Sequence, residues 1–151
     1  MLAGSVGGGL LGADASRRGA WALWAEAQRG LTDAVAARLA LHHGRVVSPS
    51  TSRTEPQAQG GLEAGLAYAI DVLRVVPSAD LALGLDWVRG QSRHGAQATL
   101  AAGLGADYLV DRHLSVGLVL RGRQALFRLG GNDEIPLFRS LFVLVRVSAT
   151  Y

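Results

Sequence analysis

The sequence predicts an all-β protein, an eight-stranded antiparallel up-and-down transmembrane β-barrel, and three observations support that prediction. Apolar residues recur at every second position along much of the chain, which is the period of a β-strand. Seven connectors rich in turn-forming residues separate the apolar runs. The positions between the apolar residues hold mostly Gly, Ala, Ser and Thr with isolated charges, whereas a sheet facing water would carry dense charge.

The composition limits the class of protein. A chain of 151 residues suits one domain with its own core, and we expect a single barrel domain over 1–151. Charged residues make up only 18%, below the roughly 25% of soluble domains. All 15 basic residues are arginine and they form no run, which argues against a nucleic-acid partner. The absence of cysteine excludes disulfides and thiolate metal sites.

The first third of the chain gives the weakest strand signal. Residues 1–11 are too rich in glycine to favour either a strand or a helix. Residues 21–28 and 35–42 alternate, but they are rich in alanine. The segment "GLTDAVAARLALHHG" (30–44) therefore also suits a helix, with Thr32 or Asp33 as its N-cap. We favour the strand and leave the helix as the alternative.

The later runs alternate strictly. In each of them Leu, Val, Ile, Ala or an aromatic residue occupies one phase, while small or single charged residues occupy the other. These runs are 62–71, 81–88, 96–110, 114–123 and 140–151. Six apolar positions from Ala98 to Tyr108 span about 24 Å at roughly 3.3 Å per step and a 40–45° tilt. That height matches the apolar band of an outer-membrane barrel, roughly 25 Å.

The connectors predict the topology. They occupy 12–18, 29–33, 43–60, 75–79, 90–95, 110–113 and 128–136. The first, third, fifth and seventh are the longer ones, so long and short links alternate, as expected for strands that run up and down. The link 43–60 is rich in Ser, Thr, Pro and Gln, which predicts a mobile loop.

Two barrels fit this alternation. A soluble barrel, such as a calycin-like ligand binder, would bury the aliphatic phase inside. A membrane barrel turns that phase outward to lipid and keeps the other phase in the lumen. We favour the membrane barrel, because small residues with sparse charges suit the narrow lumen of eight strands. In lipid, a closed barrel also leaves no backbone amide unpaired.

Two groups of residues follow from the predicted phases. Aromatic residues on the lipid-facing phase predict interfacial girdles: Trp21 and Trp87 near the long-loop rim, and Tyr108 and Tyr151 near the short-turn rim. Charged residues on the other phase predict a lumen charge network that plugs the barrel. Its members are Glu26, Arg38, Glu63, Asp71, Asp86, Asp107, Arg121, Arg123 and Arg146. An ion path or gated pore is the alternative use of these charges.

Arg146 shows how the phase is chosen. It lies inside "SLFVLVRVSATY" (140–151), one step out of phase with Val143, Val145 and Val147. On the lipid face near the midplane an arginine would cost roughly 2–4 kcal/mol. We therefore expect Arg146 to point into the lumen, toward Asp107 or Glu26.

The sequence resembles the small eight-stranded outer-membrane β-barrels of Gram-negative bacteria, the OmpA/OmpX-like group. The similarity rests on "GLGADYLVDRHLSVGLVLRG" (103–122), which looks like a strand–turn–strand hairpin, and on the C-terminal "LFVLVRVSATY". The resemblance implies that the barrel-assembly machinery reads Val143, Val145, Val147 and Tyr151 as an assembly signal. It also implies outer-membrane lipids as partners, periplasmic termini, outward-facing long loops and a signal peptide removed upstream.

The function expected from this resemblance is structural or interactive, without enzymatic activity or cofactor. Envelope integrity, adhesion and binding of an envelope protein partner through 43–60 and 128–136 all fit. A small-solute channel and a lipid-modifying enzyme are the alternatives on the same fold. His113 and Ser115 resemble the His-x-Ser of some outer-membrane lipid A deacylases, but they lie at a predicted turn. His42, His43 and His94 match no standard metal-ligand spacing.

Overall fold

The computed structural model is a closed barrel of eight antiparallel strands, in which each strand pairs with the next and β1 pairs with β8. The structure describes residues 1–13, 16–47, 57–70, 74–90, 94–129 and 137–150. The strands are β1 (Leu2–Ala13), β2 (Ser16–Gly30), β3 (Val35–Val46), β4 (Ala58–Ala69), β5 (Val75–Arg89), β6 (His94–Leu109), β7 (Leu114–Leu129) and β8 (Phe138–Ala149). The predicted all-β, eight-stranded up-and-down barrel is thus confirmed.

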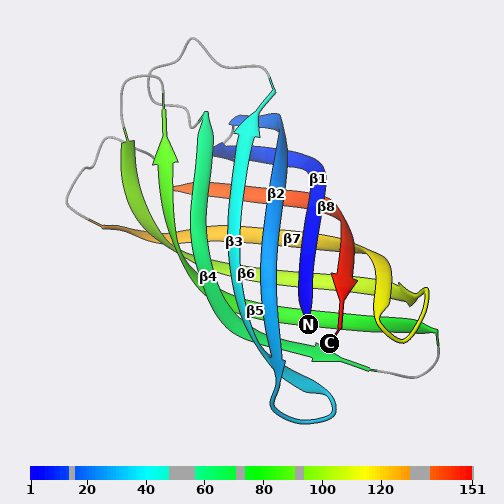
Figure 1. The fold of residues 1–151 in the computed structure, drawn as a ribbon. Coiled ribbons are helices and arrows are strands. Elements are labelled where there is room, and N and C mark those ends of the chain that lie inside the picture. Colours follow the sequence, from blue (N-terminus) through cyan, green and yellow to red (C-terminus); the bar gives the residue numbers. More distant parts are fainter. Residues whose placement is uncertain (14–15, 48–56, 71–73, 91–93, 130–136, 151) are drawn as a thin grey trace.

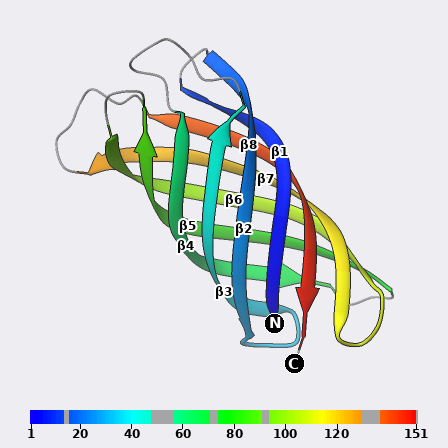
Figure 2. The same cartoon turned by 45° about the horizontal axis from the view of Figure 1, so that its top comes forward.

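The strands are strongly tilted, and both chain ends lie at the same end of the barrel as the β2–β3 and β6–β7 turns (Figures 1 and 2). Backbone hydrogen bonds fix both ends there: the Gln28 amide donates to Met1 O at 2.9 Å, and the Thr150 amide donates to His113 O at 2.8 Å. We call this the turn end, and the opposite end the loop end. No helix among the described residues is long and apolar enough to cross a membrane.

The structure corrects several boundaries predicted from the sequence. The helix considered for 30–44 is wrong, because Val35–Val46 is a strand. The glycine-rich N-terminus is also a strand, β1. Glycine hid the alternation there, but backbone pairing needs no side chain. The expected link 75–79 lies inside β5, where the Pro77 carbonyl still accepts the Ile70 amide at 3.0 Å.

The predicted alternation of long and short links holds only in part. The links from β3 to β4 and from β7 to β8 are long, but β2 begins three residues after β1 ends, at Ser16. β5 likewise ends at Arg89 and β6 begins at His94. Strand pairing therefore continues beyond the positions where side-chain alternation fades. Half of the predicted mobile loop 43–60, residues 48–56, lies outside the described residues.

The barrel has the inverse polarity of a soluble protein. Its outer surface is a belt of exposed aliphatic side chains, with Leu83 62% and Leu104 64% exposed. Its interior holds charged side chains, with Glu63 0% and Arg121 2% exposed. A β-bulge at Leu126, between the pairs Ala98↔Phe127 and Thr99↔Ala125, leaves the outward phase of the rest of β7 intact. The phase assigned from the sequence is therefore the phase of the structure.

Toward the loop end, the interior holds an apolar cluster beside buried polar residues such as Gln59 and Gln97. Trp24 packs edge-on against Phe142 with ring centroids 5.4 Å apart, and Leu11, Val46 and Val88 belong to the same buried cluster. Leu11, Val46, Val88 and Phe142 lie in the loop-end half of their strands and Trp24 lies near the middle of β2, while most of the charged residues lie in the middle and turn-end half. The described interior therefore holds an apolar cluster and a charged layer.

Barrel closure requires a close approach of β1 to β8. A Cβ atom at Gly9 would overlap the Leu141 carbonyl oxygen, and one at Gly7 would overlap that of Val143. Both positions belong to the inward phase of β1, where the sheet curves most tightly. The intervening Gly8 points outward, and a Cβ there would meet nothing closer than Ala20 O at 3.8 Å.

We predict that Gly9→Ala lowers the stability of the barrel because β1 must move away from β8. Gly8→Ala, the matched control one position away, should be neutral or stabilising by about 0.4–1 kcal/mol through the unfolded chain. Urea unfolding of both variants in lipid vesicles measures the difference. Equal midpoints for the two variants would contradict the close approach.

Candidate functional site: the charged lumen

Alternation along the strands places a charged layer inside the barrel. Each strand from β2 to β8 contributes at least one charged side chain at an inward position, because inward residues recur at every second position. Of the nine residues predicted for the lumen, eight are buried there: Glu26, Arg38, Glu63, Asp86, Asp107, Arg121, Arg123 and Arg146. Asp71 lies outside the described residues.

Glu63 on β4 is the centre of this layer. Its Oε2 atom accepts hydrogen bonds from Arg38 on β3 at 3.1 Å and from Arg121 on β7 at 3.0 Å. Its Oε1 atom lies 2.8 Å from Arg123 Nε, also on β7. One carboxylate therefore joins strands on opposite sides of the barrel. Arg38 continues the network to Glu26 on β2, with Nε donating to Oε2 at 2.8 Å.

A second cluster surrounds Arg146 on β8. Its Nε atom donates to Asp107 Oδ1 on β6 at 3.0 Å, and a second nitrogen pairs with the other carboxylate oxygen. The guanidinium also donates to Ser78 on β5 at 3.1 Å and lies 3.6 Å from Glu26. Arg146 thus contacts both of the acids named as its partners from the sequence.

Two members of the network were missed by sequence reasoning. Asp80 accepts from Arg121 at 2.7 Å, and it shares the phase of Asp86, but the expected strand began one residue later. His42 lies in the inward phase of the expected strand 35–42 but was not included in the charge network. It is buried in β3, with Nε2 3.2 Å from Asp86 Oδ1. Its ring stacks on Trp24 at 5.3 Å. The shared phase with Arg38 was the signal that could have found it.

Charge balance explains how so many ionised groups tolerate burial. Four arginines face five carboxylates, and every one of them lies in at least one ion pair. Unpaired charges would be costly in this environment, whereas several short bonds to each group offset the loss of water. The pairs join strands on opposite sides of the lumen.

The turn-end opening of the lumen is shallow. A pocket of about 140 Å³ opens there, and Asp80, Asp107, Ser115 and Arg146 are among its lining residues. The charged cluster around Arg146 therefore borders this pocket. Toward the loop end, the apolar cluster of Trp24 and Phe142 occupies the interior.

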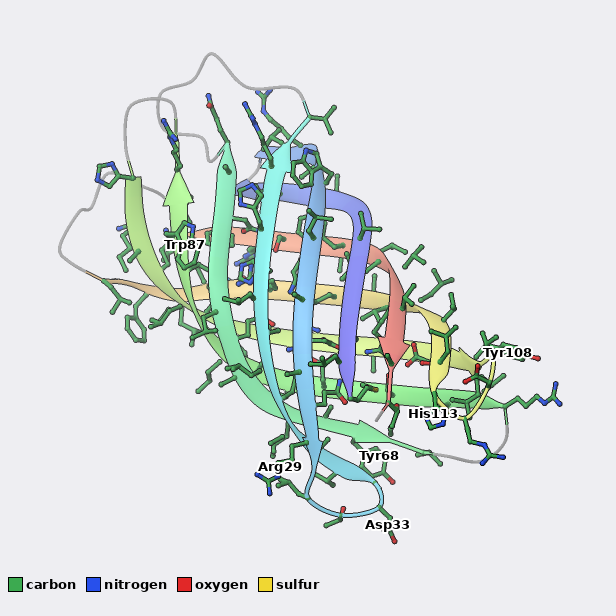
Figure 3. The ribbon with its side chains drawn as sticks, in the orientation of Figure 1. Arg29, Asp33, Tyr68, Trp87, Tyr108 and His113 are labelled. Atoms are coloured by element: carbon green, nitrogen blue, oxygen red, sulfur yellow. The ribbon has the colours of Figure 1, made fainter. Side chains whose placement is uncertain are left out.

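The aromatic residues lie at both ends of the outer surface. Trp21 and Trp87, 38% and 57% exposed, lie toward the loop end. Tyr108 lies at the turn end with Tyr68, which the predicted girdle did not include (Figure 3). Tyr151 lies outside the described residues.

The geometry at His113 and Ser115 does not assemble a catalytic triad. His113 is exposed at the turn end (Figure 3), and its Nδ1 lies 3.1 Å from the Thr150 carbonyl oxygen. Ser115 points inward and is buried. The Asp111 carboxylate accepts the backbone amides of His113 and Leu114, which shapes the turn. No group of three or more potential metal ligands occurs in the described part of the chain.

Comparison with known proteins places the fold among outer-membrane barrels. No family model matches the sequence, and no curated protein is similar to it. Among solved structures, Neisserial surface protein A (NspA) matches with a TM-score of 0.80 at 12% identity, over 99% of this chain and 96% of that one. Ail of Yersinia pestis, in complex with the heparin analogue sucrose octasulfate, gives 0.60 at 11% identity, over 98% and 96%. The N-terminal β-barrel domain of Pseudomonas aeruginosa OprF gives 0.51 at 15% identity, over 99% and 97%.

All three of these structures are eight-stranded outer-membrane barrels. The fold of this chain is therefore that of the small outer-membrane β-barrels, as the resemblance in sequence pattern implied. At these identities the similarity establishes the fold and leaves the function to be argued from this chain's own residues.

The central position of Glu63 gives a testable prediction. Glu63→Gln removes the charge shared by Arg38, Arg121 and Arg123 while keeping the side chain's shape. We expect the free energy of unfolding in lipid vesicles to fall by about 3–5 kcal/mol, the usual cost of breaking a buried ion pair. Urea titration followed by the change in gel migration measures it.

Asp33→Asn is the matched control, because Asp33 is an exposed acid at the turn end (Figure 3). It should change stability by less than about 0.5 kcal/mol. The double variant Glu63→Gln, Arg121→Gln should be less destabilised than the sum of its parts, because it removes both partners. Additive losses would show that Glu63 and Arg121 do not form a pair.

Proposed function

We propose that this chain is an integral β-barrel of the outer membrane of a Gram-negative bacterium, with a structural or interaction role. The observation that carries the proposal is the inverted polarity of the barrel. Monomeric soluble proteins rarely expose contiguous apolar patches beyond a few hundred Å², whereas here a leucine- and valine-rich belt runs around the outside. The same observation argues against a soluble calycin-like binder, which would bury these leucines and valines inside the barrel.

The arrangement of the ends supports a periplasmic location for both termini. In Figure 1 the termini lie beside the β2–β3 and β6–β7 turns, and β3 ends and β4 begins at the opposite end. Outer-membrane barrels keep short turns on the periplasmic side and long loops outside. Val143, Val145 and Val147 on β8 are 54%, 46% and 48% exposed, so they offer the barrel-assembly machinery a continuous apolar face ahead of Tyr151.

The packed interior supports a closed, non-catalytic barrel. The pairs made by Glu63 and Arg146 cross the lumen, and the apolar cluster fills the loop-end half. An eight-stranded barrel is just wide enough for side chains to fill. This argues for a plug over a small-solute channel. The exposed His113 and the inward Ser115 argue against the lipid-modifying enzyme.

An interaction role would use the loop end. The links from β3 to β4 and from β7 to β8 join strands at that end, and Ail, one of the similar structures, is known in complex with a heparin analogue. An envelope protein or another surface partner is the kind of ligand that fits such loops. The whole chain acts in this proposal as one barrel domain with outer-membrane lipids around it.

Cell fractionation tests the membrane proposal directly. We expect the protein in the outer-membrane fraction, extracted only by detergent and migrating faster on a gel before boiling than after it, because the closed barrel resists unfolding in detergent. The Glu63→Gln variant should lose the fast-migrating form at a lower temperature. Recovery of folded protein in the soluble fraction without detergent would overturn the proposal.

Planar-bilayer recording separates the plug from the channel. We expect no discrete single-channel conductance from the refolded wild-type barrel, because the charged and apolar layers both fill the lumen. A porin reconstituted in the same bilayer provides the positive control. A steady conductance that disappears with Arg121→Ala would instead assign the charged layer to an ion path.

A further inference from the structure

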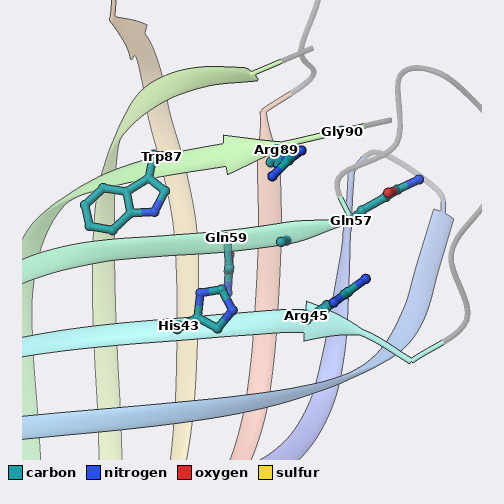
Figure 4. A pocket seen from close by; sticks show the side chains of 8 residues that line it. His43, Arg45, Gln57, Gln59, Trp87, Arg89 and Gly90 are labelled. Atoms are coloured by element: carbon teal, nitrogen blue, oxygen red, sulfur yellow. The ribbon is translucent and has the colours of Figure 1, made fainter. Parts of the chain in front are cut away.

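The outer face of the barrel carries a polar groove at the loop end. It has a volume of about 500 Å³ and lies over the end of β4, with walls from β3 and β5. Figure 4 shows Arg45 and His43 on one side and Arg89 and Trp87 on the other. The lumen charge network does not include any of these four residues.

The strand register explains why a groove forms there. Ala58 on β4 pairs with Arg45 on β3 and with Arg89 on β5. The next outward rung pairs Gly60 with His43 and Trp87. Small residues on β4 therefore form the floor, and large ones on both neighbours form the walls. The indole of Trp87 leans over Gly60, since a Cβ there would lie 2.5 Å from Nε1.

The next outward-facing rung, closer to the middle of the barrel, is entirely aliphatic. Leu62 on β4 pairs with Leu41 and Leu85, which are 41%, 56% and 55% exposed. A second, mainly apolar groove shares His43 and Trp87 with the first and continues along Leu23, Ala25 and Leu41. The outer face thus changes over three rungs from arginine, through aromatic, to leucine.

The arginines of this rim lack acidic partners among the described residues. The carboxylates on the strands that form the groove, Glu63, Asp80 and Asp86, all point into the lumen. Arg45 and Arg89 are exposed and flank a single alanine, so their backbones are about 10 Å apart, two strand spacings. Two guanidiniums on either side of such a gap suit one phosphate group, which arginine binds through paired hydrogen bonds.

We propose that this groove binds the phosphate of a membrane lipid at the outer surface, with Arg45 and Arg89 holding the phosphate and the leucine rung receiving an acyl chain. The inference rests on the membrane location proposed above. Trp87 and His43 occupy the depth where an interfacial aromatic belt lies. A soluble anion could use only the arginines, whereas a lipid uses all three rungs, and the apolar continuation of the groove favours the lipid.

Native mass spectrometry of the folded barrel in an uncharged detergent provides the test. Dioleoyl phosphatidic acid is the probe, dioleoyl phosphatidylcholine tests the tails with a zwitterionic headgroup, and inorganic phosphate tests the anion alone. We expect one phosphatidic acid per barrel, bound about tenfold more tightly than phosphatidylcholine. Arg45→Gln with Arg89→Gln should weaken phosphatidic acid binding about a hundredfold, because two charge-assisted bonds of about tenfold each are lost.

The matched control removes two exposed arginines from the turn end, Arg29→Gln with Arg112→Gln. It should leave phosphatidic acid binding within about twofold of wild type, because it changes the net charge equally without touching the groove. Equal losses in both double variants would overturn the proposal, since binding would then follow total charge. Displacement of the lipid by equimolar inorganic phosphate would overturn it too.

Gel migration before and after boiling shows whether each variant is folded. If the double variant does not fold, the single variants Arg45→Gln and Arg89→Gln replace it, and each should weaken binding. A heat-modifiable, membrane-located barrel with no preference for phosphatidic acid would overturn the lipid site alone. A soluble protein would overturn the membrane proposal as well.

Discussion

The pairing of buried charges across a narrow lumen is the constraint on which the rest of the structure depends. The single carboxylate of Glu63 contacts arginines on both β3 and β7, at 2.8–3.1 Å. Losing a partner in such a site costs more than most single contacts contribute. The inward phase of each strand is therefore set from inside by its ion pairs as well as from outside by its leucines. A slip of one residue would break both patterns at once.

The ion pairs inside and the leucines outside are compatible, because lipid favours apolar side chains and the lumen favours charged ones. Lipid disfavours arginine at mid-height on the outer face, and the network needs it inside. Glycine resolves the remaining conflict where β1 meets β8, since Gly7 and Gly9 leave room for the carbonyl oxygens of the neighbouring strand. In β1, glycine therefore lets the backbone pack closely against β8, while the later strands contribute the charges.

The fold was predictable from the sequence because the period of two survives wherever side chains are large. β5 to β8 were recognisable by their leucines and valines. β1 was not, since alternation among glycines leaves no trace. Much of the lumen set could also be assigned, because phase alone separates Arg146 from Val145. Asp80 was missed because strand pairing extends past the apolar run that marks a strand. His42 shares the phase of Arg38 but was not counted among the charged residues. The apolar cluster was missed because inward positions were expected to be small or charged, whereas Trp24 and Phe142 are large and apolar.

Function is less readable than fold, because an outer-membrane barrel offers three surfaces with separate roles. The lumen shows how the barrel is held together, while a partner role for the loop end and a lipid role for the groove between Arg45 and Arg89 are proposals that rest on separate observations. Only the lumen follows from periodicity. The groove depends on which residues meet across β3, β4 and β5, which requires the register.

Spin labelling along β8 tests most directly which face meets lipid. The chain has no cysteine, so single cysteines at Val143, Val145, Val147 and Ser148 can each carry one label in barrels reconstituted into vesicles. Oxygen, which concentrates in the bilayer, should reach the labels at the three valine positions far more readily than the label at Ser148. Greater oxygen access at Ser148 than at the valines would contradict the assignment of inside and outside for the whole barrel.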